Sequence, residues 1–147
     1  MATRTLDDAD ADADADADAL RQVLAAVSRA WEAGDVDAFV AYYTEGASAI
    51  LPGFALLGRA AIRDAMGDAF AGPLKGSRRI HQLHSVRFLN DGEGGGGGTA
   101  IAISRSGTAL PGETEPAQDR WSMATWVLSR HAGRWLVESY HDCPAAP

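Results

Sequence analysis

The chain has 147 residues, with 20 acidic against 13 basic side chains and a formal net charge of −7. This charge is concentrated at one end, because residues 1–19 carry seven Asp and one Arg, whereas the rest of the chain carries 13 acidic and 12 basic side chains. A nearly neutral body lacks the clustered Lys and Arg that nucleic-acid binding or a basic membrane-surface patch requires, which argues against both as partners.

The length suits one domain, with a core that buries roughly 70% of the surface of the unfolded chain. No apolar run approaches the ~20 residues of a membrane span, and Asp stands where a signal peptide needs basic and apolar residues. The single cysteine, Cys143, cannot form an intramolecular disulfide. We therefore expect a cytoplasmic protein that does not need an oxidising compartment.

Ala and Asp alternate without interruption between residues 9 and 19. Asp is not β-prone, like charges repel two residues apart in an extended chain, and nothing in the segment repays the entropy of ordering. We expect residues 1–17 to be a disordered, solubilising head and residues 18–147 to be a single domain. A weak divalent-cation site in the head is the alternative, although the spaced ligands and turn glycine of a calcium loop are missing.

Three helices are predicted in the first half of the domain. Asp18 is a suitable N-cap for the first helix, whose apolar residues recur at helical spacing until Gly34 ends it. Asp35 caps a short second helix. A short apolar strand at 47–51 ends in a turn, and a third helix follows at 59–70.

The second half of the chain is predicted to be sheet, because β-branched and aromatic residues alternate with turn residues. The expected strands are 80–89, 99–106, 118–130 and 134–142, and a glycine-rich hairpin loop spans 91–98. Helices first and strands last indicate an α+β fold. We expect a cone-shaped, strongly curved, mainly antiparallel sheet of four long and one or two short strands, wrapped around three N-terminal helices and enclosing a cavity.

Short motifs along the chain carry a family resemblance. They are Gly58-Arg59-Ala60-Ala61-Ile62, Gly72-Pro73-Leu74-Lys75-Gly76-Ser77-Arg78, Val86-Arg87-Phe88-Leu89, Thr125-Trp126-Val127-Leu128 and Gly133-Arg134-Trp135, with His141 closing the last strand. In this order they resemble the SnoaL-like proteins of the nuclear transport factor 2-like superfamily, and within it the SgcJ/EcaC group. The group commonly ends in a His-Asn-Thr-like stretch, whereas this chain has His141-Asp142-Cys143.

The resemblance implies a role in enediyne antibiotic biosynthesis in actinomycetes, beside a polyketide synthase. The expected function is to bind, and through acid/base chemistry to transform, a hydrophobic polyketide-derived intermediate as a cofactor-independent isomerase, cyclase or hydratase. A non-catalytic accessory or carrier protein that assists the synthase is the alternative. The sequence has no phosphate-binding loop, dinucleotide fingerprint or zinc motif, so we expect no cofactor and no metal.

The last strand supplies the main catalytic candidate. Residues of one parity share a face there: Trp135, Val137, Ser139 and His141. Glu138 lies on the opposite face and should prefer water, so we expect the His141 face to point inward. An imidazole there is suited to general acid or base chemistry near neutral pH. A histidine hydrogen-bonded at the mouth of the sheet, with no catalytic role, is the alternative.

The length of the last turn sets the register. A three-residue turn at 131–133 pairs Arg130 with Arg134, and the inner face of the preceding strand then carries Asp119, Trp121, Met123, Thr125 and Val127. A two-residue turn would exchange the faces. Asp119 is the candidate carboxylate partner, although it lies about 13 Å along the strand from the position opposite His141, too far for a direct hydrogen bond.

Two further side chains complete the expected pocket. His81 and His84 are three residues apart on a strand, so one of them faces inward, and the more apolar face nominates His84. Tyr43, at the end of the second helix, could cap the cavity, and a core aromatic is the alternative. The expected ligand pocket therefore comprises Tyr43, His84, Trp121, Met123, Thr125 and Ser139.

The opposite face of the sheet predicts the quaternary structure. In the three-residue register it carries Trp126, Leu128, Leu136 and Tyr140, a large apolar patch for a monomer. We therefore expect a homodimer through the outer face of the sheet.

Overall fold

The computed structural model describes residues 6–90 and 98–145. The predicted glycine-rich loop therefore falls almost entirely outside the described residues. Within them the chain forms helices α1 (Leu6–Ala33), α2 (Val36–Val40) and α3 (Arg59–Ala71), strands β1 (Tyr43–Leu51), β2 (Phe54–Leu57), β3 (Arg78–Asn90), β4 (Thr99–Ala109), β5 (Trp121–His131) and β6 (Arg134–Pro144), and a 3-10 turn at Gln118–Arg120.

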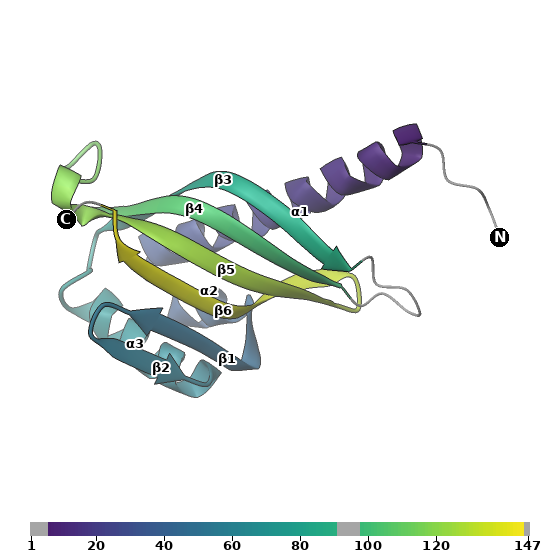
Figure 1. Cartoon of the computed structure of the whole chain (residues 1–147). Coiled ribbons are helices and arrows are strands. Elements are labelled where there is room, and N and C mark those ends of the chain that lie inside the picture. The colour runs from purple at the N-terminus through teal and green to yellow at the C-terminus, as the bar shows by residue number, and fades with distance from the viewer. Residues whose placement is uncertain (1–5, 91–97, 146–147) are drawn as a thin grey trace.

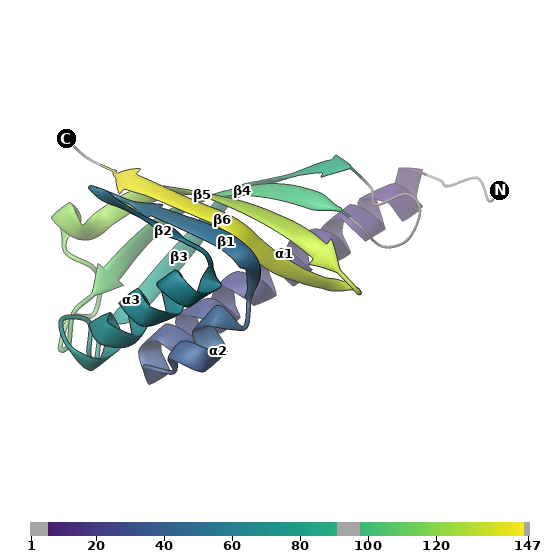
Figure 2. The same ribbon diagram turned by 90° about the horizontal axis from the view of Figure 1, so that it is seen from below.

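The strands of the described chain form one open sheet in the order β2-β1-β6-β5-β4-β3. All neighbours are antiparallel except β1 and β6, which run parallel. The helices cover one face of the sheet, with α1 against β3 and β6, α3 against β1 and β2, and α2 between the other two helices (Figures 1 and 2). This arrangement confirms the predicted α+β fold with an unclosed, mainly antiparallel sheet.

The first helix begins earlier than the sequence predicts. It starts at Leu6 instead of after Asp18, so residues 6–17 are helical in the structure rather than disordered. Alanine has the highest helix propensity, and aspartates near a helix N-terminus interact favourably with the helix dipole. This part of α1 extends beyond the sheet, where Asp16 Oδ1 lies 3.6 Å from Arg130 Nη1 (Figure 1). The proposed boundary between head and domain stays a prediction.

The junctions between the helices follow the predicted signals. Gly34 has φ = 67° and its N–H donates to the carbonyl of Trp31, which ends α1. The Asp35 carboxylate accepts the backbone N–H of Ala38 at 3.0 Å and caps α2. Side chains of the helices then pack with the inner face of the sheet, and Trp31, Phe39 and Phe70 form an aromatic group with Tyr43 of β1.

The β5–β6 turn has two residues, not three. His131 pairs with Arg134, and the two residues between them, Ala132 and Gly133, have φ values of 51° and 82°. Positive φ at both positions is typical of the type I′ turn, whose twist matches that of the strands. The alternative register is therefore the observed one, and the inner face of β5 carries Ala124, Trp126 and Leu128, which are all buried.

Two β-bulges further change which side chains face inward. In β6 the extra residue is Glu138, because Val137 pairs with Leu128 and Ser139 pairs with Val127. In β3 the extra residue is His84, because the neighbours Leu83 and Ser85 pair with consecutive residues of β4. A bulge shifts the alternation of a strand by one residue. The inner face of β6 therefore changes from Trp135 and Val137 to Tyr140 and Asp142, and that of β3 changes from Arg79, His81 and Leu83 to Val86 and Phe88.

The apolar patch predicted on the outer face is not formed by the expected residues. Trp126, Leu128 and Tyr140 are 1%, 0% and 7% exposed and belong to the core, because the two-residue turn and the Glu138 bulge direct them inward. Those three of the four patch residues therefore cannot contact a second copy of the chain.

Candidate functional site

A cavity of about 310 Å³ lies between the helices and the inner face of the sheet. Its walls are mainly apolar and come from every layer of the fold: Val27 and Trp31 of α1, Phe39 of α2, Ile62 and Met66 of α3, and Tyr43, Ala49, Leu51 and Trp126 of the sheet. Ligand pockets of proteins are typically of this kind and size, with mostly apolar walls and a few polar groups.

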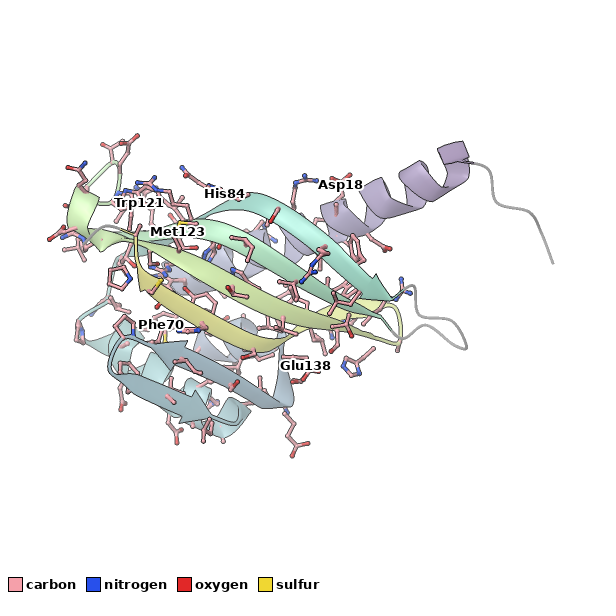
Figure 3. All side chains as sticks on the ribbon, in the orientation of Figure 1. Asp18, Phe70, His84, Trp121, Met123 and Glu138 are labelled. Carbon is pink, nitrogen blue, oxygen red and sulfur yellow. The ribbon has the colours of Figure 1, made fainter. Side chains whose placement is uncertain are left out.

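The β4–β5 connection, the β1–β2 turn and the end of β6 lie at one end of the sheet (Figures 1 and 2), and each contributes an exposed residue to the cavity lining, so we place the mouth of the cavity at this end. The lining residues Pro52, Asp119 and Pro144 are exposed there. Trp121 stands at this end of β5 (Figure 3), half-buried, with the guanidinium of Arg105 3.9 Å from its ring centroid. The mouth therefore combines a carboxylate with a fixed aromatic ring.

The β4–β5 connection at the mouth is held in place by ionic and backbone contacts. Glu113 accepts the backbone N–H of Leu110 at 2.8 Å and pairs with Arg120, and Arg78 donates to the carbonyls of Glu113 and Thr114. These hydrogen bonds hold the pKa of Glu113 below its usual range. The segment that carries Asp119 is thus fixed to the ends of β3 and β4.

A charged cluster lies on the inner face of the sheet within the cavity lining. Arg79 Nη2 donates to Tyr140 Oη at 2.8 Å and lies 3.2 Å from Asp142 Oδ2, and the Tyr140 hydroxyl donates to the same Oδ2 at 2.7 Å. The side chains of Arg79 and Asp142 are only 11% and 7% exposed. A buried charge requires a partner of opposite charge with good hydrogen-bond geometry, and these two residues supply it for each other.

The other polar atoms of this cluster differ in whether they have hydrogen-bond partners. Arg79 Nη1 donates to Thr108 Oγ1 at 2.9 Å, and the guanidinium also lies 5.6 Å from the ring centroid of Trp31. Burial raises the pKa of Tyr140, which keeps its phenol protonated as a donor to Asp142. The second oxygen of Asp142, Oδ1, is buried without a hydrogen-bond partner among the described residues. Oδ1 is therefore an acceptor oxygen that is enclosed by the protein and whose hydrogen-bonding capacity is unused among the described residues.

His81 is the second polar group of the cavity. Its Nδ1 lies 2.7 Å from Ser106 Oγ, and its ring packs edge-on against Trp126 with centroids 4.9 Å apart. Burial and the nearby Arg79 charge lower the pKa of His81 to about 3, so the imidazole is neutral at physiological pH. His81 therefore contributes a neutral polar group, not a charge, to the cavity.

Three of the predicted site residues line the cavity. They are Tyr43, Asp119 and Trp121. Tyr43 is buried, which raises the pKa of its hydroxyl, and Asp119 is at the exposed mouth. Asp119 and Trp121 are neighbours at the start of β5, and the fold brings Tyr43 of β1, which is distant in the sequence, into the same cavity.

The other predicted site residues lie outside the cavity lining: His84, Met123, Thr125, Ser139 and His141. His141 is exposed on the outer face opposite Thr125, so the expectation that its face points inward is wrong. Ser139 bonds there to Ser48 at 2.9 Å. His84 is exposed at its bulge, and His81 is the inward histidine instead. Met123 and Thr125 face outward because the turn has two residues. The bulges at His84 and Glu138 account for the outward positions of His84, Ser139 and His141.

Arg79, His81, Tyr140 and Asp142 are the cavity residues that the sequence did not nominate as a site. The alternative two-residue register correctly predicts the inner face of β5. All four residues lie on the faces of β3 and β6 that were expected from the sequence to point outward. Among the described residues no group of three or more His, Cys, Asp or Glu side chains is arranged to hold a metal ion. No helix in the described part is both long and apolar enough to cross a membrane.

Comparison with known proteins agrees with this architecture. The model of the SnoaL-like domain matches residues 13–141. A domain of unknown function with a cystatin-like fold from Nostoc punctiforme superposes with a TM-score of 0.77 at 28% identity, over 90% of this chain and 79% of that chain. An NTF2-like protein from Novosphingobium aromaticivorans gives a TM-score of 0.68 at 20% identity, over 99% and 93% of the two chains.

A more distant solved structure has the same fold. Aln2 from a Streptomyces species superposes with a TM-score of 0.62 at 20% identity, over 85% of this chain and 87% of that chain. None of the proteins with curated annotation matches the chain. Because the family model covers most of the chain, from within α1 to within β6, this protein belongs to the family of SnoaL-like domains.

Proposed function

We propose that the protein binds an uncharged, hydrophobic, polyketide-derived molecule in this cavity and transforms it by acid/base chemistry. The observation that carries the proposal is an apolar cavity of about 310 Å³ whose wall contains the buried Arg79, Tyr140 and Asp142 cluster. Because the positive and negative charges of the cluster neutralise each other, the cavity suits an uncharged ligand. The resemblance of the sequence motifs to the SgcJ/EcaC group supports an enediyne intermediate, an actinomycete source and a cytoplasmic site of action beside the synthase.

Asp142 is the proposed proton acceptor. Its Oδ2 is occupied by Arg79 and Tyr140, and Oδ1 has no hydrogen-bond partner but is enclosed by the protein, so the proposal requires the side chains that cover Oδ1 to move before it takes a proton from the ligand and returns it at another position. Removal of a proton and its return at another position of the same molecule is an isomerisation, and the removal alone, which leaves a carbanion, is the first step of a cyclisation. Tyr140 orients the carboxylate. Asp119, at the mouth, and His141, on the outer face, have no part in this step.

A pair of tryptophan substitutions tests ligand binding. Met66→Trp places a bulky indole ring in the cavity wall, whereas Thr125→Trp places the same ring on the exposed outer face. With 2-acetylnaphthalene as a probe in calorimetric titration, we expect Met66→Trp to weaken binding at least tenfold and Thr125→Trp to change it less than twofold. Equal effects of the two substitutions, with both variants folded, contradict binding in the cavity.

A pair of isosteric carboxylate substitutions tests the chemistry. Asp142→Asn and Asp119→Asn each remove one negative charge, the first inside the cavity and the second at its mouth. In a producing strain that lacks its own copy of the gene, we expect Asp142→Asn to abolish restoration of the antibiotic and Asp119→Asn and His141→Gln to restore it. Thermal unfolding of each purified variant shows whether a loss has a structural cause.

A non-catalytic carrier is the second candidate function. The observation that favours it is the full pairing of the Arg79 charge, which gives the cluster a complete structural role without any ligand. A carrier requires the cavity but not the proton acceptor. Loss of product in Met66→Trp together with full restoration by Asp142→Asn would therefore identify the carrier and exclude proton transfer by Asp142.

The proposal includes a homodimer through the outer face of the sheet. The residues that support it differ from those expected, because the outward side chains of β4 and β5 include Ile101, Ile103, Met123 and Val127, and Ile50 of β1 is 40% exposed. Sedimentation equilibrium at micromolar concentration should give a mass near twice the 15.4 kDa of the chain. A mass of one chain at that concentration contradicts the dimer.

A further inference from the structure

A hydrogen-bonded chain of buried side chains connects two residues of the cavity wall, Trp126 and His81. Trp126 Nε1 lies 2.9 Å from Ser104 Oγ, Ser104 Oγ lies 2.9 Å from Ser106 Oγ, and Ser106 Oγ lies 2.7 Å from His81 Nδ1. Both serines are 0% exposed. Each hydroxyl must therefore donate its proton to an acceptor inside the protein, or the donor remains unsatisfied.

The direction of the hydrogen bonds follows from counting protons. An indole nitrogen only donates, so Ser104 accepts from Trp126. The single proton of the Ser104 hydroxyl then goes to Ser106, its remaining side-chain partner. Ser106 in turn has one proton left, and His81 Nδ1 is its acceptor. The opposite direction would leave the Ser104 proton buried without an acceptor, which is costly.

A ring nitrogen that accepts a hydrogen bond carries no proton, so the proton of the neutral imidazole is on Nε2. Nε2 has no hydrogen-bond partner among the described residues and is not one of the fully buried atoms without a partner, so part of its surface is exposed. His81 lines the cavity and also borders a groove between α1 and β3. The low pKa of His81, about 3, agrees with a ring that does not take up a second proton.

Arg79, a further donor of the inner face, is already engaged. Its two terminal nitrogens donate to Thr108 and Tyr140, and its charge is neutralised by Asp142. An accessible donor for a ligand is therefore the Nε2–H of His81. Its partner on the ligand should be an uncharged acceptor, because a neutral imidazole offers a hydrogen bond and no net charge.

We infer that His81 is a fixed hydrogen-bond donor of the cavity, held in its Nε2–H tautomer by the Trp126, Ser104 and Ser106 chain, and that it binds a carbonyl or ether oxygen of the ligand. This inference rests on the proposed function for its ligand and goes beyond it, because it assigns the ligand an oxygen acceptor and His81 a positioning role instead of a role as a base.

The tautomer is measured without any ligand. Long-range ¹H–¹⁵N correlation spectra of the imidazoles distinguish a protonated from an unprotonated ring nitrogen, and His81→Gln identifies which of the four histidines is His81. We expect a protonated Nε2 and an unprotonated Nδ1 at pH 7. Ser106→Ala should mix the two tautomers, because it removes the donor to Nδ1. A protonated Nδ1 or a doubly protonated ring in the unmodified protein overturns the inference.

The ligand acceptor is measured with a matched pair of probes, 2-acetylnaphthalene and 2-ethylnaphthalene, which differ in the ketone oxygen. We expect His81→Leu to weaken binding of the ketone relative to the hydrocarbon by roughly threefold to tenfold, the size of one net hydrogen bond. His81→Gln keeps an N–H donor and should preserve most of the preference. An unchanged ratio in a folded His81→Leu variant overturns the role of His81 in binding.

The two proposals fail in different ways. If neither probe binds the unmodified protein, binding of such molecules in the cavity is contradicted, and the ¹⁵N spectra still decide the tautomer. If both probes bind but the ratio of their dissociation constants is the same in the unmodified protein and in His81→Leu, the cavity is a ligand site and the assignment of the acceptor is wrong. The melting temperatures of the Leu and Gln variants serve as the control. Values within a few degrees of each other show that both variants are folded.

Discussion

Buried and exposed ion pairs of this chain differ in what each residue contributes to stability. The Arg79–Asp142 pair is nearly enclosed, with side chains 11% and 7% exposed, whereas the side chains of the Arg63–Asp37 pair are 51% and 74% exposed. Removing one partner of a buried pair leaves an uncompensated charge, whereas an exposed pair is compensated by water and screened by salt.

Arg79→Met and Arg63→Met form a matched test of this difference. We expect Arg79→Met to lower the free energy of unfolding by about 3 kcal/mol or more and Arg63→Met to lower it by less than about 1 kcal/mol. Urea unfolding monitored by circular dichroism measures both. A loss below about 1 kcal/mol for Arg79→Met would show that the cavity admits enough water to solvate Asp142.

His81 should make the stability depend on pH. Its pKa is about 3 in the folded chain and near ~6.5 in the unfolded chain, so below about pH 6.5 the unfolded state takes up a proton that the folded state does not. The free energy of unfolding therefore falls as the pH decreases from about 6.5 toward 3, by at most about 1.4 kcal/mol per pH unit. His81→Gln should flatten this dependence, measured by urea unfolding at pH 7, 6 and 5. A slope in this variant equal to that of the unmodified protein contradicts the prediction.

At the scale of elements, the sequence predicts the number and order of helices and long strands, because apolar periodicity and turn residues determine them locally. The face of each strand is less predictable. Glu138 correctly indicated that Val137 faces inward, but its own bulge then reversed the alternation and turned Tyr140 and Asp142 into the cavity. Val86 and Phe88 likewise pack inward as expected. On the N-terminal side of the bulge at His84 the alternation is reversed, so the inward residues there are Arg79, His81 and Leu83.

These bulges have no local signature in the chain. Glu138 accepts hydrogen bonds from Thr44 and Ser129, two residues on neighbouring strands, which fix it at the bulge in the lower half of the sheet (Figure 3). The cause of the bulge is therefore contact between strands distant in sequence, and a single strand does not reveal it. The polar residues of the candidate site could not be predicted for this reason, although Arg79, His81, Tyr140 and Asp142 each belong to a predicted strand or lie directly beside one.

Gly107 of β4 is required by close packing at the mouth. A Cβ atom at this position would lie 2.8 Å from Pro116 Cγ and 2.8 Å from Trp121 Cε3, closer than real contacts allow. We expect Gly107→Ala to lower the free energy of unfolding by about 1–3 kcal/mol and to shift the Trp fluorescence, because Trp121 must move. Gly46→Ala in β1 is the control, since a Cβ there meets nothing within 4 Å. Equal stability of the two variants contradicts this account of the mouth.

For the whole molecule, the first turns of α1 and the mouth of the cavity lie at opposite ends (Figures 1 and 2). Deletion of residues 1–15 should therefore leave the dissociation constant for 2-acetylnaphthalene unchanged within twofold and remove most of the net charge. Deletion of residues 1–17 also removes Asp16, which pairs with Arg130. The calorimetric titration checks both deletions, and a tenfold loss of affinity in the shorter deletion would give the Asp-Ala segment a part in binding.

The parallel pairing of β1 with β6 has a consequence for how the chain is made. Residues near 48 pair with residues near 139, so the strand beside α3 has its main neighbour only when the last strand has left the ribosome. Contacts of such large sequence separation form slowly, and strands without partners are exposed to association with other chains. The helices and the β1–β2 hairpin must wait during synthesis, and the cavity, whose walls come from both ends of the chain, can close only in the final step.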